Sequence, residues 1–249
     1  MLKKRVIPAL LIKDNLLVKT KKFKHPRSIG SIIEAVKLYD LREVDELIVL
    51  DISSSFNNQE PNYKTILEIS KECFVPLAIG GGINNINTIY KVLKNGADKV
   101  VISSEAIKNP FFIKEASEEF GSQCIVVSLD YHKKSKKLFL KNNNVETNYN
   151  ILDFAMKAEE MGAGELVITC VDREGTMQGY DYDTIKDLKK NVMIPLLASG
   201  GAGSYQDMLK AFKYSNVDGV VASSIYCFGN KTPKEAKLFL KTSGINVRS

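Results

Sequence analysis

Eight short apolar runs recur along the chain, and each has the length of a single strand. They are rich in Val, Ile and Leu and contain few polar residues. Uninterrupted apolar runs of this kind are typical of strands buried on both faces, as in a parallel sheet covered by helices. The runs span residues 5–12, 46–52, 76–80, 99–103, 124–130, 165–170, 195–199 and 219–223.

Helical patterns lie between these runs. In the segments SIIEAVKLYDL, YKTILEISKE, NTIYKVLKNG and TIKDLKK, apolar residues return every three or four positions, which predicts helices with one apolar face. Asn95-Gly96, after the third of these segments, is typical of a helix C-terminus. Strands and helices alternate over 249 residues without a linker or low-complexity stretch. The pattern therefore predicts one α/β domain, a single (β/α)8 TIM barrel.

The second half of the chain repeats the first. PLAIGGGI and GADKVVISSE return as PLLASGGAG and NVDGVVASSI, so that Pro76 matches Pro195 and Asp98 matches Asp218. A repeat at half the chain length indicates two duplicated half-barrels, about residues 1–120 and 121–249. The same alignment places Asp130, at the end of the fifth run, against Leu11 in the first.

Composition narrows the class of protein. At 44% hydrophobic and 26% charged residues, the chain can bury a full core and has no signature of disorder. No apolar run approaches the ~20 residues of a membrane span, and the basic start MLKKRVIPALLI is better interpreted as a strand than as a signal peptide. The four cysteines lack metal-ligand spacing, so no metal and no cofactor is expected. We interpret Cys124 and Cys170 as core thiols of a cytoplasmic protein.

The charge balance favours an anionic ligand. The net charge is +6, and lysines gather around residues 19–27 and 133–137. Nucleic acid is the rival anionic ligand, but no known binding module and no pattern of aromatic platforms is present. The composition therefore favours an anionic ligand, and it indicates neither nucleic acid nor a membrane as a partner.

Two matched sets of glycine and serine follow strands three and four and strands seven and eight. Glycine lets backbone N–H groups approach an anion closely, and serine hydroxyls add further donors. A single Gly-Gly pair could simply make a tight turn, but two matched sets favour phosphate binding. They suggest an elongated ligand with a phosphate at each end, or an ancestor that bound one. The first cradle is Gly81, Gly82, Ser103 and Ser104, and the second cradle is Gly200, Gly201, Ser223 and Ser224.

A family resemblance extends over essentially the whole chain. The pieces KRVIP, DELIVLDI, PLAIGGGI, FGSQCIVVSLD, DREGTMQGYD, IPLLASGGAG and GINVR resemble the cyclase subunit of imidazole glycerol phosphate synthase, HisF. The resemblance implies a (β/α)8 barrel that pairs with a HisH-like glutaminase and passes its ammonia through the barrel. There the ammonia joins a ribulotide with two phosphate ends, which closes an imidazole ring and releases an aminoimidazole ribotide. The resemblance also implies that the chain is a lyase-type synthase subunit of a glutamine amidotransferase system.

The catalytic pattern of that family is only partly present. The family uses two aspartates, one mainly as acid and one as base. Asp130 matches one of them, but Leu11 stands at the other position and has no proton to donate. Lys19, on the basic loop after the first strand, matches a lysine that the family needs. Gly175, in the segment DREGT, joins the phosphate-binding set, and Glu174 stands where the family usually has Asp.

The resemblance also implies an ammonia gate at the bottom of the barrel. Two acids and two bases that converge there can neutralise one another, which offsets their desolvation. The alternative is ordinary ion pairing at an exposed surface. Asp98 matches a family position at the interface with the glutaminase. The gate positions are Arg5, Glu46, Lys99 and Glu165.

Three functions remain open. The Leu11 pattern, followed by LVKT and an FK-x-P segment, is similar to a branch of the family associated with surface-polysaccharide genes. That branch works beside a glutaminase and a sugar amidotransferase, and its ammonia makes amidino groups on acetamido sugars. The alternatives are a working histidine-pathway cyclase and a non-catalytic partner barrel of a glutaminase. A phosphoribosyl isomerase, the sister barrel, matches less closely. His25 and His132 are candidate replacement acids, or else solvent-exposed loop residues.

Overall fold

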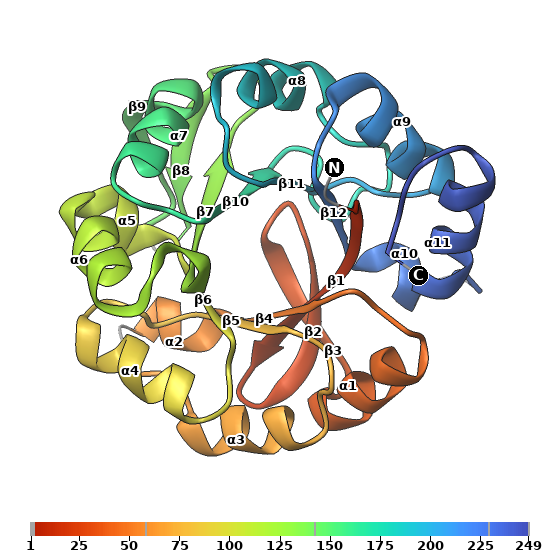
Figure 1. The fold of residues 1–249 in the computed structure, drawn as a ribbon. Coiled ribbons are helices and arrows are strands. Elements are labelled where there is room, and N and C mark those ends of the chain that lie inside the picture. Colours follow the sequence, from red (N-terminus) through yellow and green to blue (C-terminus); the bar gives the residue numbers. More distant parts are fainter. Residues whose placement is uncertain (1–2, 58, 142, 229, 249) are drawn as a thin grey trace.

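The computed structural model describes residues 3–57, 59–141, 143–228 and 230–248, and within them the chain forms a closed parallel barrel (Figure 1). The ring runs β1, β4, β5, β6, β7, β10, β11, β12, and the pairings of β7 with β10 and of β12 with β1 complete it. The predicted (β/α)8 barrel is confirmed. Because β1 and β7 stand four places apart in this ring, they lie on opposite sides. The strands are β1 (Arg5–Lys13), β4 (Leu47–Asp51), β5 (Leu77–Gly80), β6 (Lys99–Ile102), β7 (Ile125–Tyr131), β10 (Glu165–Cys170), β11 (Leu196–Ser199) and β12 (Gly219–Ala222).

Helices surround the ring of strands (Figure 1). Polar caps mark where they begin: the Asn85 side chain accepts a hydrogen bond from the Thr88 N–H at the start of α4. The same helix ends beside Gly96 at φ +100°, as the sequence predicts. The long helices are α1 (Ile32–Leu41), α3 (Tyr63–Lys71), α4 (Ile86–Lys94), α6 (Phe111–Phe120), α7 (Ile151–Glu160), α8 (Tyr182–Asn191), α9 (Tyr205–Ser215) and α11 (Pro233–Thr242). The short ones are α2 (Ile52–Asn57), α5 (Ser104–Lys108), α10 (Ser224–Cys227) and the 3-10 turn η1 (Ser122–Cys124).

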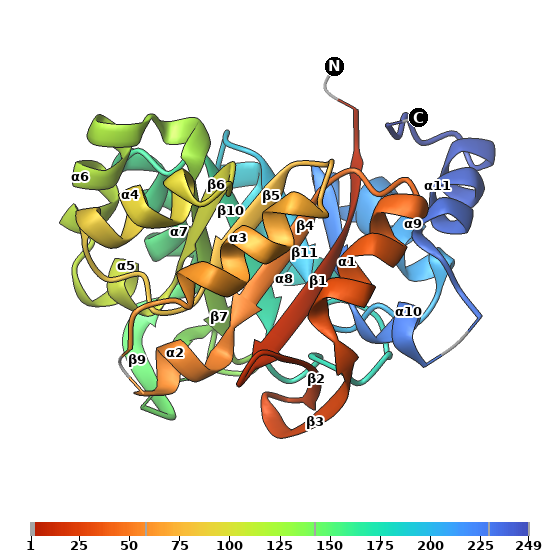
Figure 2. The same cartoon turned by 90° about the horizontal axis from the view of Figure 1, so that it is seen from below.

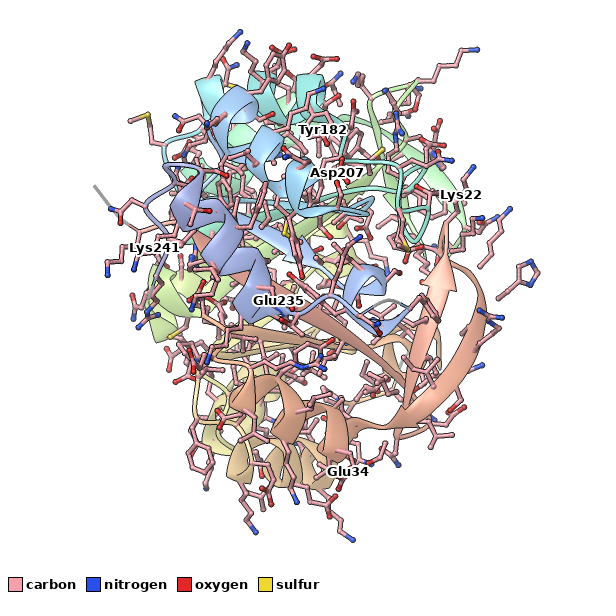
Figure 3. The ribbon with its side chains drawn as sticks, turned by 90° about the vertical axis from the view of Figure 1, so that its right-hand side faces the viewer. Lys22, Glu34, Tyr182, Asp207, Glu235 and Lys241 are labelled. Carbon is pink, nitrogen blue, oxygen red and sulfur yellow. The ribbon has the colours of Figure 1, made fainter. Side chains whose placement is uncertain are left out.

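Adjacent helices are also joined by side chains. The Tyr182 hydroxyl, at the start of α8, donates to Asp207 Oδ1 of α9 over 2.9 Å, and Figure 3 shows the two side chains together. Asp207 also completes a capping box with Ser204. One carboxylate therefore both starts α9 and fixes it to α8.

The barrel has two distinct ends (Figure 2). We call the end at which the strands begin the floor, and the chain termini lie there. The opposite end, at which the strands finish, is the mouth, and the strands β2, β3 and β9 project from it. No helix in the described ranges combines the length and the apolar character needed to cross a membrane.

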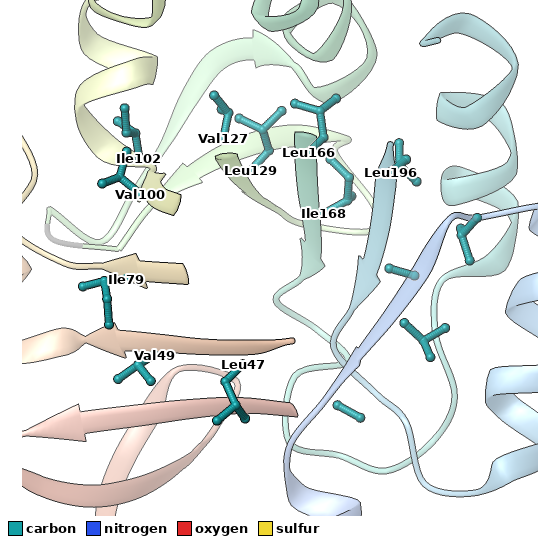
Figure 4. Close-up of a cluster of buried hydrophobic side chains, with 14 of the residues drawn as sticks. Leu47, Val49, Ile79, Val100, Ile102, Val127, Leu129, Leu166, Ile168 and Leu196 are labelled. Atoms are coloured by element: carbon teal, nitrogen blue, oxygen red, sulfur yellow. The ribbon is translucent and has the colours of Figure 1, made fainter. Parts of the chain in front are cut away.

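Alternation along each strand divides the buried side chains into two groups. One set points outward and packs under the helices, and Figure 4 shows part of it, including Leu47, Val100 and Leu166. The other set points into the barrel and forms a separate apolar layer. That inner layer consists of Ile7, Ile48, Ala78, Val101, Val126, Val167, Leu197 and Val221.

Two hairpins were not expected from the sequence. The segment interpreted as a basic loop after the first strand folds into β2 (Leu16–Lys21) and β3 (Lys24–Ser31), which pair with β1. Its turn places Lys22 and Phe23 at φ +53° and +59°. Because such turns normally carry Asn or Gly, the usual hairpin signal is absent from this sequence. A second hairpin, β8 (Lys137–Leu140) with β9 (Val145–Asn150), follows β7.

The thiol prediction is half correct. Cys170 is buried in β10 as expected. Cys124 was expected inside a strand, but it lies in the turn η1 and is only half-buried. The turn precedes β7 because the backbone N–H of Cys124 bonds back to the carbonyl of Gly121, which delays the strand by one residue.

Candidate functional site

A cavity of about 220 Å³ opens at the mouth, inside the ring of strand ends. Its walls come from every second residue of the strands and from the loops that follow them. The structure therefore brings together the residues that the sequence predicts from distant segments. Those that line the cavity are Leu11, Lys19, Gly81, Gly82, Ser103, Ser104, Asp130, Glu174, Gly175, Gly200, Gly201, Ser223 and Ser224.

The two glycine-serine cradles have matching backbones. Ser103 precedes α5 at φ −124° and ψ −86°, and Ser223 precedes α10 at φ −138° and ψ −69°. Gly81 and Gly201 have φ near +110°, and a Cβ atom on either would lie within 2.2 Å of a backbone oxygen. Only glycine fits at these two points. The close approach explains the glycines as turns, and phosphate binding by the cradles stays a prediction.

Lys19 lies on β2 and is buried, although the sequence placed it on a loop. Its ammonium group donates to the Ser223 hydroxyl, which in turn donates to the carbonyl oxygen of Ala9. Burial lowers the pKa of Lys19, while Glu174 acts in the opposite direction. The hairpin thus delivers a buried lysine to the second cradle, beside the serine that precedes α10.

Asp130, at the end of β7, is the central ionisable group of the cavity. Burial raises its pKa to about 7, which the Lys141 ammonium and a hydrogen bond from Thr169 partly oppose. Glu174 raises the pKa further. A carboxyl group with this pKa can both donate and accept a proton near neutral pH. Leu11, on the opposite strand β1, lines the same cavity and offers neither function.

Lys141 was not singled out in the sequence, yet it lines the cavity. It follows β8 directly, and its ammonium group lies 4.7 Å from the centre of the Phe23 ring. Burial lowers its pKa, and the charges of Asp130 and Glu174 raise it. In the sequence Lys141 is one lysine among several, and no pattern distinguishes it from the others.

Glu174 fastens the first hairpin over the mouth. Its two carboxylate oxygens accept hydrogen bonds from the Thr20 hydroxyl at 2.9 Å and from the Phe23 N–H at 2.8 Å. Gly175 has φ +67°, and a Cβ atom there would lie 2.4 Å from the Thr20 carbonyl oxygen. The close contact with the hairpin explains this glycine, and its phosphate-binding role stays a prediction.

The two histidines lie outside the cavity lining. His25 is exposed on β3. His132 lies beside Asp172, with Nδ1 3.4 Å from Oδ2, and packs edge-on against Phe139. Neither side chain is placed to replace the acid missing at Leu11. Among the described residues, no group of three or more His, Cys, Asp or Glu side chains is arranged to hold a metal ion.

The four predicted gate residues meet at the floor. Arg5 lies 2.8 Å from Glu46 and also contacts Glu165. Lys99 Nζ lies 2.9 Å from Glu46 and 3.0 Å from Glu165. Burial acts to lower the pKa of Arg5, but the two carboxylates raise it above its ordinary value. We call these four side chains the floor ring; the apolar inner layer separates it from the mouth cavity.

Asp98, the predicted interface residue, is exposed on the floor but also has a structural partner. Its Oδ2 accepts a hydrogen bond from the Leu77 N–H at 2.8 Å. Asp218, its match in the second half, accepts from the Leu196 N–H at 3.0 Å. The two aspartates thus repeat one contact between neighbouring strands.

Three large apolar side chains are strongly exposed around the floor. They are Leu41, Phe74 and Met193, with 78%, 80% and 87% of their surface exposed. Each lies in or beside the connection that leads from a helix into the next strand. Exposed apolar groups gathered on one face are typical of a protein interface.

Comparisons with known proteins cover most or all of the chain. Residues 5–232 match the model of a family described as histidine biosynthesis protein. "Imidazole glycerol phosphate synthase subunit HisF" of Dictyoglomus thermophilum is 41% identical over 251 residues, which cover 100% of this chain and 99% of that protein. The subunits of the same name from Pelodictyon phaeoclathratiforme and Chloroherpeton thalassium are 39% and 38% identical over 250 residues, 100% of each chain.

Proposed function

The chain belongs to the HisF family of histidine biosynthesis proteins, and on that premise we propose that it is an ammonia-receiving synthase barrel. In this proposal, a glutaminase partner docks on the floor, ammonia passes the floor ring and the inner layer, and a phosphorylated ligand occupies the mouth. Activity as a lyase-type synthase subunit is part of the proposal.

The observation that carries the proposal is the order of layers along the barrel axis. Charged side chains form the floor ring, apolar side chains such as Ile48 and Val167 form the inner layer and the bottom of the mouth cavity, and polar groups such as Asp130 lie at the strand ends above them. Neutral ammonia crosses an apolar layer far more easily than ammonium, because burying an unpaired charge is costly. This order therefore suits a molecule that enters neutral at one end and reacts at the other.

The residues exposed on the floor are evidence for a protein partner. Leu41, Phe74 and Met193 expose apolar surface around the floor ring, and Asp98 adds a charge on the same face. Apolar groups around a central charged opening favour a partner that covers the opening and keeps bulk water out. A glutaminase of the HisH type, which would release ammonia there, fits this arrangement.

The residues at the mouth favour a function that has diverged from the histidine pathway. Leu11 removes one of the two carboxyl groups that the family reaction uses, and neither His25 nor His132 replaces it in the cavity. We propose that the ammonia instead serves a sugar amidotransferase that makes amidino groups on surface sugars. The segments LVKT and FK-x-P, which follow Leu11, support this branch.

A working histidine-pathway cyclase is the second candidate. Two observations favour it: the names of the relatives described above, and the raised pKa of Asp130, which suits a general acid or base. In that case the cavity would form imidazole glycerol phosphate and aminoimidazole ribotide with only one aspartate.

One assay separates the two candidates. The purified chain is given ammonium and the ribulotide, and formation of imidazole glycerol phosphate is followed. We expect a rate ~10²–10⁴-fold below that of the Dictyoglomus thermophilum subunit, because a general acid contributes about that factor. Leu11→Asp should raise the rate at least tenfold if the remaining site is intact, whereas Leu11→Asn, which adds polarity without an acidic proton, should not.

The outcomes have different meanings. A wild-type rate within tenfold of the relative's would contradict the divergence and establish the cyclase. A slow wild type without any gain in Leu11→Asp would mean that the mouth has changed at further positions. If glutaminase binding then persisted alone, the chain would be the non-catalytic partner barrel.

A further inference from the structure

The mouth contains a cation that the two-aspartate pattern does not include. Lys141 lines the cavity from the β8–β9 hairpin, on the side of the barrel where β7 and β10 end. Its side chain is half-buried, and its ammonium group packs over the Phe23 ring at 4.7 Å. Lys141 thus belongs to the second hairpin and contacts Phe23 of the first, whereas Lys137 of the second hairpin is exposed.

The polar neighbours of Asp130 come from three segments, and two of them are charged. Lys141 approaches from the β8–β9 hairpin and Glu174 from the loop after β10, while Thr169 of β10 supplies a hydrogen bond. Glu174 already accepts bonds from the first hairpin on both of its oxygens. Lys19, the buried lysine of the cavity, donates to the Ser223 hydroxyl. Lys141 is thus the cation available to Asp130.

We propose that Lys141 and Asp130 form a proton donor–acceptor pair on one side of the mouth, in which Lys141 supplies, from the Asp130 side, a proton that Leu11 cannot donate. The inference rests on the proposed function, since it supplies the proton transfer that a ligand bound between the cradles would need. The Lys141 ammonium donates a proton to a ligand atom and becomes a neutral amine. The Asp130 carboxylate takes up a proton that the ligand or the incoming ammonia releases.

The pairing has a physical basis in the shared environment. Burial disfavours both charges, and their mutual attraction restores them in part. The pKa of Asp130 is raised and that of Lys141 is lowered, so each group gives up or takes up a proton more readily than an exposed group of its kind. The Phe23 ring further limits the water around the ammonium group.

The test is a titration that needs neither ligand nor glutaminase, so its failure is distinct from failure of the proposed function. The full chain is labelled with carboxyl-¹³C aspartate, and the Asp130 signal, assigned with Asp130→Asn, is followed by NMR from pH 4 to 10. In Lys141→Met we expect the pKa of Asp130 to rise by about one unit, since the nearby cation is lost. In Lys141→Arg, which keeps the charge, it should stay within about 0.5 unit of wild type.

A matched control and a second measurement complete the experiment. Lys134→Met removes an equal charge from an exposed site near the same hairpin and should leave the Asp130 titration unchanged. The Lys141 amine itself, labelled by ¹³C-methylation and assigned with Lys141→Arg, should titrate clearly below ordinary lysines. An unchanged Asp130 pKa in Lys141→Met, or an ordinary Lys141 titration, would overturn the pair.

Discussion

Two matching positions in the barrel are chemically different. Leu11 and Asp130 occupy matching places at the ends of β1 and β7, on opposite sides of one cavity. The aspartate has a pKa of about 7 because it is buried, while the leucine turns its side of the mouth apolar. Burial of this carboxyl group should leave a measurable cost in stability when the group is charged.

Asp130→Asn tests that cost through its dependence on pH. The folded pKa of about 7 lies above the ordinary value of 3.8, so the folded chain binds this proton more tightly than the unfolded chain. Wild-type stability should therefore fall as the pH rises from about 4 to about 7, a dependence that the variant lacks. Between pH 5 and pH 8, the free energy of unfolding of the variant relative to wild type should rise by roughly 1–3 kcal/mol. Thermal unfolding should show this as a relative rise in melting temperature of several degrees.

The control is an exposed aspartate. Asp14→Asn, in the turn after β1, should show the same difference from wild type at both pH values. If Asp130→Asn also gave equal differences at pH 5 and pH 8, Asp130 would be an ordinary carboxylate and unsuited to proton transfer in the mouth.

At the scale of elements, the two cradles have the same arrangement of glycines and serines. They differ in the lysine that reaches each of them. Each cradle joins glycines after one strand to a Ser-Ser pair that starts a short helix. The second cradle receives the buried Lys19 from the β2–β3 hairpin, whereas the first has the exposed Lys108 of α5 in the cavity lining. A buried lysine is screened less by solvent, so the second cradle should hold an anion more tightly.

Phosphate binding tests the two cradles separately. In crystals soaked with inorganic phosphate, we expect density beside Ser103 and Ser104 and beside Ser223 and Ser224. Lys19→Met should weaken the second position by about tenfold or more, as loss of a charge-assisted hydrogen bond does, and should spare the first. Lys108→Met should affect only the first, and less strongly. Two empty cradles in the wild type would mean that the glycines serve only as turns.

For the whole molecule, the floor combines a charged ring with an exposed apolar rim. The ring carries two acids and two bases, so it can be closed without a large net charge. Asp98 is a poor probe of this face, because its loss also removes the hydrogen bond from Leu77. The exposed apolar side chains test the interface without disturbing the barrel.

Phe74→Glu and Met193→Glu should each weaken association with a co-purified glutaminase at least tenfold, since buried apolar contacts are replaced by a charge. Both side chains are more than three-quarters exposed, so the melting temperature should hardly change. Phe111→Glu, an exposed apolar site at the start of α6, is the matched control. Equal binding by all three variants would contradict a partner on the floor.

The sequence by itself determined the barrel and most of its site. Apolar runs predict strands, the repeat gives equivalent strand ends, and closure of a parallel barrel brings those ends together, so Asp130 and the cradles could be placed from the pattern, while the floor ring was implied by the family resemblance. Only the tertiary structure decided the rest. The turn at Lys22 has a positive φ without Gly or Asn, so its hairpin could not be predicted from the sequence. Lys141 and Glu174 make their contacts with residues of a separate hairpin. Such contacts leave no periodic trace in a sequence, because they depend on how whole segments pack.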